Sequence, residues 1–162
     1  MAQVGGTGDE HVWSDPALVR HANRLAASFR RIVGRDLVAP SRDPRDVARR
    51  LFEAPFALLS HGVQEDPVLN YGNCTALKLW EMRFEDFTRM PSRVTAEQML
   101  REERERLLAI AAQKGFIDDY AGVRISSTGR RFRIENAIIW NVLDEDGARL
   151  GQAATFDRWA TA

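Results

Sequence analysis

Hydrophobic residues in the first part of the chain recur at helical spacing. From residue 18 to residue 32 the apolar side chains follow at intervals of three and four, which predicts an amphipathic helix with one apolar face. The triplet Ser-Asp-Pro at 14–16 is a favourable start for this helix, and Gly34 is a favourable end. A second start at residues 41–44 predicts a short helix that stops before Pro55.

The middle of the chain changes to shorter elements. Residues 56–60 form a short apolar run that predicts a buried strand, and residues 68–71 predict a second strand that pairs back after a turn. Asn73 can then cap a helix over residues 74–82. A smaller helix is expected before Pro91, because proline does not continue a helix.

The sequence Thr-Ala-Glu-Gln at residues 95–98 has the pattern of a capping box. It predicts that the longest helix covers residues 96–114 and ends at Gly115. After this glycine the pattern changes to the alternation of apolar and polar residues that is typical of strands. The predicted strands cover residues 116–127, 131–143 and 150–159.

Two strands, several short helices and three antiparallel strands together predict an α+β fold. The expected architecture is a PAS-like five-stranded antiparallel sheet with short helices on one face and an N-terminal helical extension. The expected boundaries are a disordered tail at residues 1–12, the helical extension at 13–54 and the PAS-like domain at 55–162. Domains with this order of elements are usually sensors or docking modules.

Composition narrows the class of protein and of partner. The chain has 162 residues, of which 44% are hydrophobic and 28% charged, as in a soluble globular domain. Its formal net charge of zero argues against nucleic acid and anionic membranes as partners. The single cysteine, Cys74, fits a reducing compartment, and no apolar run approaches the roughly 18 residues of a membrane span. We therefore expect a cytoplasmic protein.

A family resemblance covers most of residues 51–156. It rests on the segments LFEAPFALLSHGVQEDPVLNYGNCTALKLWEM, FTRMPSRVTAE and QKGFIDDYAGVRISSTGRRFRIENAIIWNVLDEDGARLGQAATF. The chain resembles a bacterial stand-alone member of the MEKHLA family, a PAS-related group. This resemblance implies a sensory or regulatory role, and it brings no catalytic residues and no identified ligand or cofactor. Without an attached effector segment, a signal would pass through a partner or through self-association.

The strand at 131–143 carries an amide in a row that is otherwise apolar. At period two, the residues predicted to share this face are Phe132, Ile134, Asn136, Ile138, Trp140 and Val142. Gln152 is a similar amide among apolar neighbours on the next strand. A buried amide without a partner costs about 1–3 kcal/mol. Asn136 and Gln152 are therefore expected either to bond to each other across the sheet or to contact a ligand.

Further candidates lie on or near the helix at 74–82. Asn73 either caps this helix or offers its amide to a ligand. Cys74 follows an asparagine, as the reactive cysteine of LOV flavin photoreceptors does, but it stands earlier in the chain, and a small buried thiol is the alternative. Trp80 and Trp140 are large enough either to line a pocket or to fill it.

Other chemistries find little support in the sequence. His61 is expected at a turn on the edge of the domain, which disfavours heme, and the histidines are too scattered to form a metal set with Cys74. Ser60 and His61 are neighbours that strand alternation places on opposite faces, and the same holds for Asp118 and Asp119. We therefore predict no enzyme and no metal site.

The leading hypothesis is a sensory or regulatory module that binds a small organic ligand. Its pocket would lie between the helix at 74–82 and the sheet face that carries Asn136, Trp140 and Gln152. The alternative is a protein–protein interaction or dimerisation domain with a filled core. The apolar stripe of residues 18–32 can form a homodimer contact or pack against its own domain.

Overall fold

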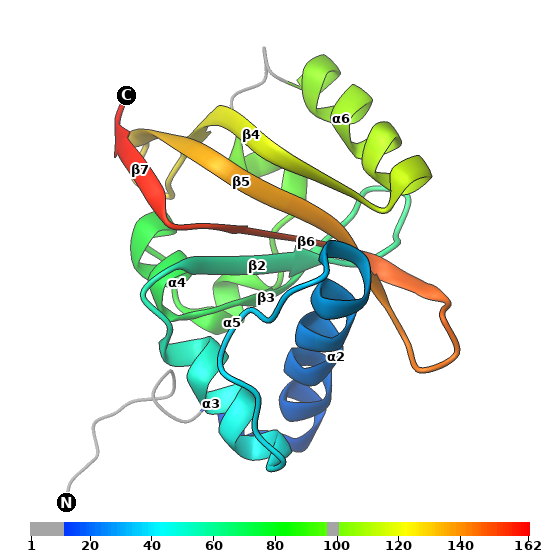
Figure 1. Cartoon of the computed structure of the whole chain (residues 1–162). Helices are drawn as coiled ribbons and strands as arrows, with labels where there is room; N and C mark the ends of the chain where they lie inside the picture. The colour runs from blue at the N-terminus through cyan, green and yellow to red at the C-terminus, as the bar shows by residue number, and fades with distance from the viewer. Residues whose placement is uncertain (1–11, 97–100) are drawn as a thin grey trace, which may run out of the picture.

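The computed structural model describes residues 12–96 and 101–162, and its centre is an antiparallel sheet. The strands lie in the order β3-β2-β6-β5-β4, and β7 also pairs with β5 (Figure 1). Their bounds are Ala57–His61 (β2), Leu69–Gly72 (β3), Phe116–Ile125 (β4), Arg131–Leu143 (β5), Arg149–Phe156 (β6) and Arg158–Thr161 (β7). The predicted α+β class with its antiparallel sheet is confirmed, with one strand more than expected.

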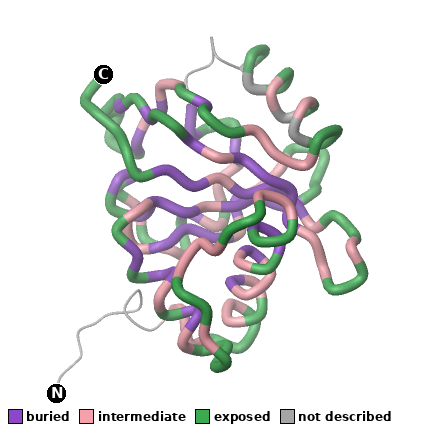
Figure 2. Tube along the Cα trace, in the orientation of Figure 1, coloured by how far each residue is buried: buried purple, intermediate pink, exposed green. Residues whose placement is uncertain are grey.

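Helices cover both faces of the sheet. The helix α2 (Pro16–Val33) lies over one face, while α4 (Cys74–Trp80) and α5 (Phe84–Phe87) lie behind the other (Figure 1). The remaining helical elements are η1 (Val12–Ser14), α3 (Pro44–Glu53), η2 (Ser92–Thr95) and α6 (Arg101–Lys114). The buried residues concentrate in the central strands between these layers (Figure 2). We call the face toward α2 the outer face and the face toward α4 the inner face.

The amphipathic helix predicted from the first apolar stripe is α2. Its N-terminal cap is Asp15, whose carboxylate accepts the N–H groups of residues 17 and 18, and Gly34 ends it at φ 94°. Leu25 and Phe29 are fully buried, and the Phe29 ring meets Trp140 edge-on with 4.7 Å between centroids. The stripe therefore packs against its own sheet. The homodimer stays a prediction that this packing does not favour.

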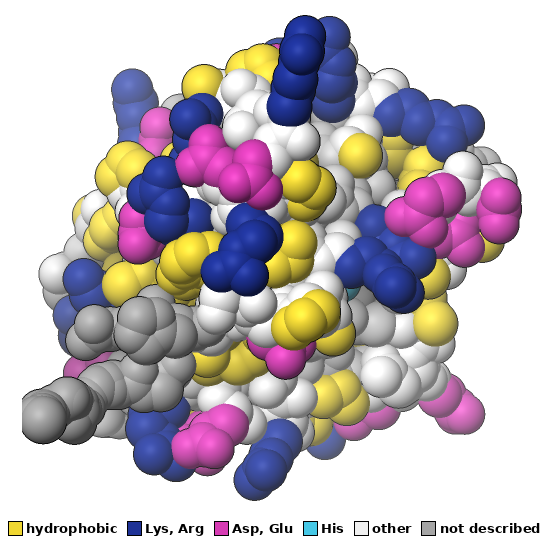
Figure 3. Space-filling model, turned by 90° about the horizontal axis from the view of Figure 1, so that it is seen from below, with side chains coloured by type: hydrophobic (Ala, Val, Ile, Leu, Met, Phe, Trp, Pro, Cys, Tyr) yellow, Lys and Arg dark blue, Asp and Glu magenta, His cyan; other side chains and the backbone are white. Residues whose placement is uncertain are grey.

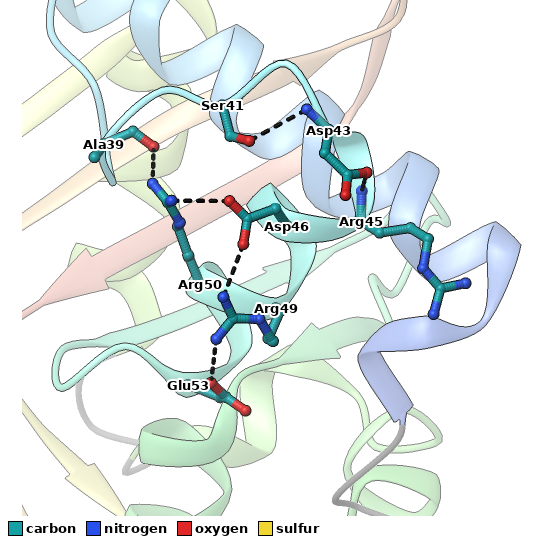
Figure 4. A network of polar contacts seen from close by, with 8 residues as sticks. All are labelled: Ala39, Ser41, Asp43, Arg45, Asp46, Arg49, Arg50 and Glu53. Atoms are coloured by element: carbon teal, nitrogen blue, oxygen red, sulfur yellow. Dashed lines mark hydrogen bonds and ion pairs between the residues drawn. The ribbon is translucent and has the colours of Figure 1, made fainter.

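Charged side chains form a network along α3 (Figure 4). Arg49 contacts Asp46 at 2.8 Å and Glu53 at 3.2 Å, and Arg50 contacts Asp46 and the carbonyl of Ala39. The hydrogen bond from Arg49 lowers the pKa of Asp46. Such exposed pairs contribute little stability. Figure 3 shows that basic and acidic side chains are interspersed over the side of the molecule seen from below, in agreement with the zero net charge.

Two bulges alter the alternation of the long strands. Asp119 in β4 and Asn136 in β5 have positive φ, at 60° and 53°, and the β4–β5 register shifts beside each of them. The prediction that alternate residues from Phe132 to Val142 share one face is therefore wrong. Phe132 and Ile134 face inward, but beyond the bulge the inward positions are those of residues 137, 139 and 141.

The predicted strand at 150–159 is in fact two strands. It is interrupted at Asp157, and β7 then continues along the same edge of β5. The last β5–β7 pair joins Glu135 to Arg158, and the first β5–β6 pair joins Ile138 to Thr155. The interruption therefore lies opposite the Asn136 bulge, where the ladder of β5 is disturbed.

The predicted helix start at residue 96 is also wrong. The hydroxyl of Thr95 donates to the carbonyl of Ser92 at 2.8 Å, instead of capping a following helix. Ala96 is extended and forms a β-bridge with Arg124. The predicted helical residues 97–100 lie outside the described residues.

Candidate functional site

A cavity of about 60 Å³ lies between the inner face of the sheet and the helices that cover it. One water molecule needs roughly 10–15 Å³, so this space holds a few waters or a small organic molecule. Small side chains leave the space open, since Ala137 and Ala154 are the inward residues at the middle of β5 and β6. Leu107 of α6 and the end of η2 form the opposite wall.

One end of the cavity is aromatic. Trp80 is 1% exposed, and its ring contacts Phe132 at 5.0 Å and Phe156 at 6.2 Å, both in edge-to-face geometry. Phe87 of α5 packs on the same indole. These contacts fix the position of Trp80, which together with Phe156 gives the cavity an apolar wall.

A row of polar residues crosses the inner face on three adjacent strands. His61 of β2 lies beside Gln152 of β6, which lies beside Asn141 of β5. The Gln152 Nε2 group donates to Asn141 Oδ1 at 3.4 Å, and the Arg149 Nε group donates to the same oxygen at 3.1 Å. In His61 the Nδ1 group donates to the carbonyl of Gly62 at 2.9 Å, because a carbonyl only accepts.

Arg124 and Tyr120 of β4 form a second polar group in the cavity wall. Arg124 is only 8% exposed, and its guanidinium lies 5.3 Å from the centroid of the Tyr120 ring. Its Nη2 group donates to the Tyr120 hydroxyl at 3.2 Å, and its Nη1 group donates to the Val123 carbonyl at 3.2 Å. Gly122 lies between them, and a Cβ there would be 2.6 Å from the Tyr120 oxygen. The missing side chain therefore makes room for the pair.

Two lining residues contain buried polar atoms that have no hydrogen-bond partner within the described part of the chain. These atoms are Gln152 Oε1 and Trp80 Nε1. Tyr71 and Trp140 also have such an atom, but neither residue lines the cavity. Each unsatisfied group costs about 1–3 kcal/mol. A molecule in the cavity that offers a donor and an acceptor would recover part of this cost.

The structure brings two of the six predicted ligand contacts to the cavity, Trp80 and Gln152. Trp140 is fully buried on the outer face against Phe29, and Asn136 is exposed in its bulge. The prediction that these two residues share a pocket face with Gln152 is therefore wrong. The predicted bond between Asn136 and Gln152 is replaced by the bond between Gln152 and Asn141. Cys74 is half-buried at the start of α4 and does not line the cavity.

Asn73 has the structural role that the sequence left open. Its Oδ1 accepts the N–H groups of Leu58 at 3.0 Å and Ala76 at 3.1 Å. Its Nδ2 donates to the carbonyls of Leu51 at 3.0 Å and Phe56 at 2.8 Å. The amide thus caps α4 and joins it to β2 and α3, with all its bonding capacity in use.

Sequence reasoning missed three cavity residues. His61 was expected at a turn on the edge of the domain, but it is only 8% exposed and lines the cavity. Tyr120 and Arg124 were not singled out, although Tyr-x-Gly-x-Arg at period two places an arginine on the same strand face as an aromatic residue. Within residues 12–96 and 101–162, no group of His, Cys, Asp and Glu could hold a metal ion, and no helix is long and apolar enough to cross a membrane.

The comparison with protein families decides the identity of the chain. The sequence profile of the MEKHLA domain matches residues 19–161. The chain belongs to the MEKHLA family. The match begins inside α2, so this MEKHLA domain includes most of that helix as well as every element of the cavity. A comparison with curated proteins gives no match.

Solved structures similar to this MEKHLA domain are PAS and LOV domains. A PAS domain from Colwellia psychrerythraea has a TM-score of 0.62 at 12% identity, with 73% of this chain and 95% of that chain covered. A LOV domain studied with a flavin analogue has a TM-score of 0.56 at 12% identity, covering 72% and 84%. The PAS domain of a LuxR-family transcriptional regulator from Burkholderia thailandensis, in complex with ethanol, has a TM-score of 0.51 at 16% identity, covering 65% and 91%. These likenesses establish the PAS-like fold.

Proposed function

We propose that this MEKHLA domain is a sensory or regulatory module that binds a small organic ligand in the inner cavity. The observation that carries the proposal is the cavity itself, whose lining includes two buried polar atoms, on Gln152 and Trp80, that have no partner among the described residues. A ligand that offers them a donor and an acceptor gains these two hydrogen bonds. Apolar walls with a few convergent polar groups are typical of small-molecule sites.

The position of the cavity supports a sensory role. Its lining comes from all strands of the sheet except β7, and also from α4, η2 and α6 on the other side. A bound molecule would therefore contact both layers and change how the helices pack on the sheet. The ethanol complex of the Burkholderia thailandensis PAS domain shows that a domain of this fold can hold a very small organic molecule. We infer a binding role and no reaction.

The test is native mass spectrometry of the full chain purified from its own host, followed by thermal unfolding with and without any molecule found. We expect an excess mass per subunit that disappears on denaturation. The released compound should raise the melting temperature of the stripped protein, because it binds only the folded state. A bare mass and no stabilisation by extracts of the host would contradict the proposal and favour an interaction domain.

Two amide substitutions locate the site. Gln152→Leu removes the carboxamide that faces the cavity, and we expect it to reduce the affinity for the released compound about tenfold, as loss of one buried hydrogen bond does. Asn136→Gly is the matched control, since it also removes a carboxamide but from an exposed position where glycine suits the positive φ. Equal effects of the two variants would remove the cavity from the proposal.

A further inference from the structure

Arg124 is a buried cation whose counter-charge is not found in the described part of the chain. The residue is 8% exposed, and no ion pair within residues 12–96 and 101–162 includes it. Arginine stays protonated at all ordinary pH values. A buried charge is normally paired, because its removal from water is costly.

The neighbours of Arg124 use only part of its bonding capacity. A guanidinium has five N–H groups. The described contacts are one bond to the Tyr120 hydroxyl and one to the Val123 carbonyl, and both acceptors are neutral. The Tyr120 ring and Gly122 hold the guanidinium in place within the cavity wall. A planar guanidinium that is held in place has the geometry to bind a carboxylate through two parallel hydrogen bonds.

The rest of the lining selects what kind of anion fits. Most of the wall is aliphatic or aromatic, with Trp80 and Phe156 on one side and Ile134 and Ile139 along β5. An inorganic anion such as phosphate would need donors all around it. An organic molecule with one charged end and an apolar body matches one arginine in an apolar cavity.

We propose that the ligand of this cavity is a small organic carboxylate, and that Arg124 binds its carboxylate group. The inference rests on the proposed function and names the chemical class of the ligand. Tyr120 orients the guanidinium through its hydroxyl and its ring, and the unpaired Gln152 Oε1 accepts only from a donor group on the ligand other than its carboxylate. The free volume of about 60 Å³ limits the ligand to a short carboxylic acid.

The test compares acids with neutral molecules of the same shape. Stripped full-length protein is titrated by calorimetry with propionate and butyrate, with propionamide and butyramide, and with inorganic phosphate, all at one ionic strength. We expect at least one acid to bind at least tenfold more tightly than its amide, since hydrogen bonds to a charged group are worth about two neutral ones. Phosphate should not compete. Equal binding of acid and amide overturns the inference but leaves the proposed function standing.

Substitutions assign the effect to one side chain. Arg124→Gln should remove the preference for the acid, and Arg124→Lys should retain only part of it, because an ammonium lacks the planar fork. Arg133→Gln is the matched control, since Arg133 is exposed and pairs with Val123 on the neighbouring strand. If Arg124→Gln fails to fold, Tyr120→Phe removes only the hydroxyl and should weaken the acid several-fold. A preference for the acid that survives both Arg124 variants overturns the inference.

One further variant tests whether the protein supplies its own carboxylate. Glu97 follows Ala96, which bridges to Arg124, and it lies outside the described residues. If Arg124 awaits a ligand, Glu97→Gln should bind the acids as the unmodified protein does. If the acids bind only to Glu97→Gln, the native protein neutralises Arg124 internally, and the inference is wrong.

Discussion

His21 of α2 should make the stability of the domain depend on pH. Its Nε2 lies 2.9 Å from the Ser60 hydroxyl oxygen, and that hydroxyl donates to Asn70 Oδ1 at 2.5 Å. The Ser60 oxygen therefore accepts from His21, which fixes the neutral tautomer with the proton on Nε2. The ring also contacts the buried Tyr71 at 5.8 Å between centroids. Burial, with a smaller contribution from Arg24, lowers the pKa of His21 from 6.5 to about 4.

The direction and size of the effect follow from this pKa. Because the folded state binds the proton less tightly than the unfolded chain, stability is complete above pH 6.5 and is lost as the pH falls toward 4. The full difference corresponds to about 3 kcal/mol, and at about pH 5 roughly 2 kcal/mol of it is lost. His21 is half-buried, so solvent screens part of the charge. We therefore expect a loss of about 1–2 kcal/mol between about pH 7.5 and pH 5.

The assay is urea unfolding of the native protein and of His21→Gln at about pH 7.5, 6 and 5. Glutamine can still donate to Ser60 but does not titrate, so the difference between the two proteins isolates His21 from His61 and from the carboxylates. Glu145, whose pKa the hydrogen bond from Arg24 lowers to about 2, loses its contribution only below this range. If both proteins lose the same stability between pH 7.5 and pH 5, the ring is already solvated, and the reasoning is refuted.

Two further substitutions test how the elements around the cavity are joined. Asn73→Ala should destabilise the domain by about 3 kcal/mol in urea unfolding, because it leaves the buried N–H groups of Leu58 and Ala76 unpaired. A loss under about 1 kcal/mol would show that water replaces the amide. Gly151→Ala should lower the free energy of unfolding by more than about 2 kcal/mol, because a Cβ there would lie 1.9 Å from the His61 carbonyl oxygen, between β2 and β6. An unchanged melting temperature would contradict this close approach.

Local patterns predicted the elements, but the faces of the long strands depended on contacts that sequence periodicity does not record. The stripe of α2 and the caps at Gly34 and Asn73 are local features, and the structure confirms them. The bulge at Asn136 is different, because a single residue at positive φ reverses the inward and outward positions beyond it. Asparagine tolerates this conformation better than most residues, which is the one signal that the sequence offered.

The same bulge explains why the cavity exists. Had the alternation continued unbroken, Ile138 and Trp140 would have faced inward and filled the space beside Trp80. The bulge turns Trp140 outward against Phe29 of α2 and places Ala137 on the inner face. The large side chain thus secures the packing of α2, while the small one leaves the volume open beside Gln152. Straightening the bulge with every residue retained would therefore exchange these roles, which couples the integrity of the cavity to the seating of α2.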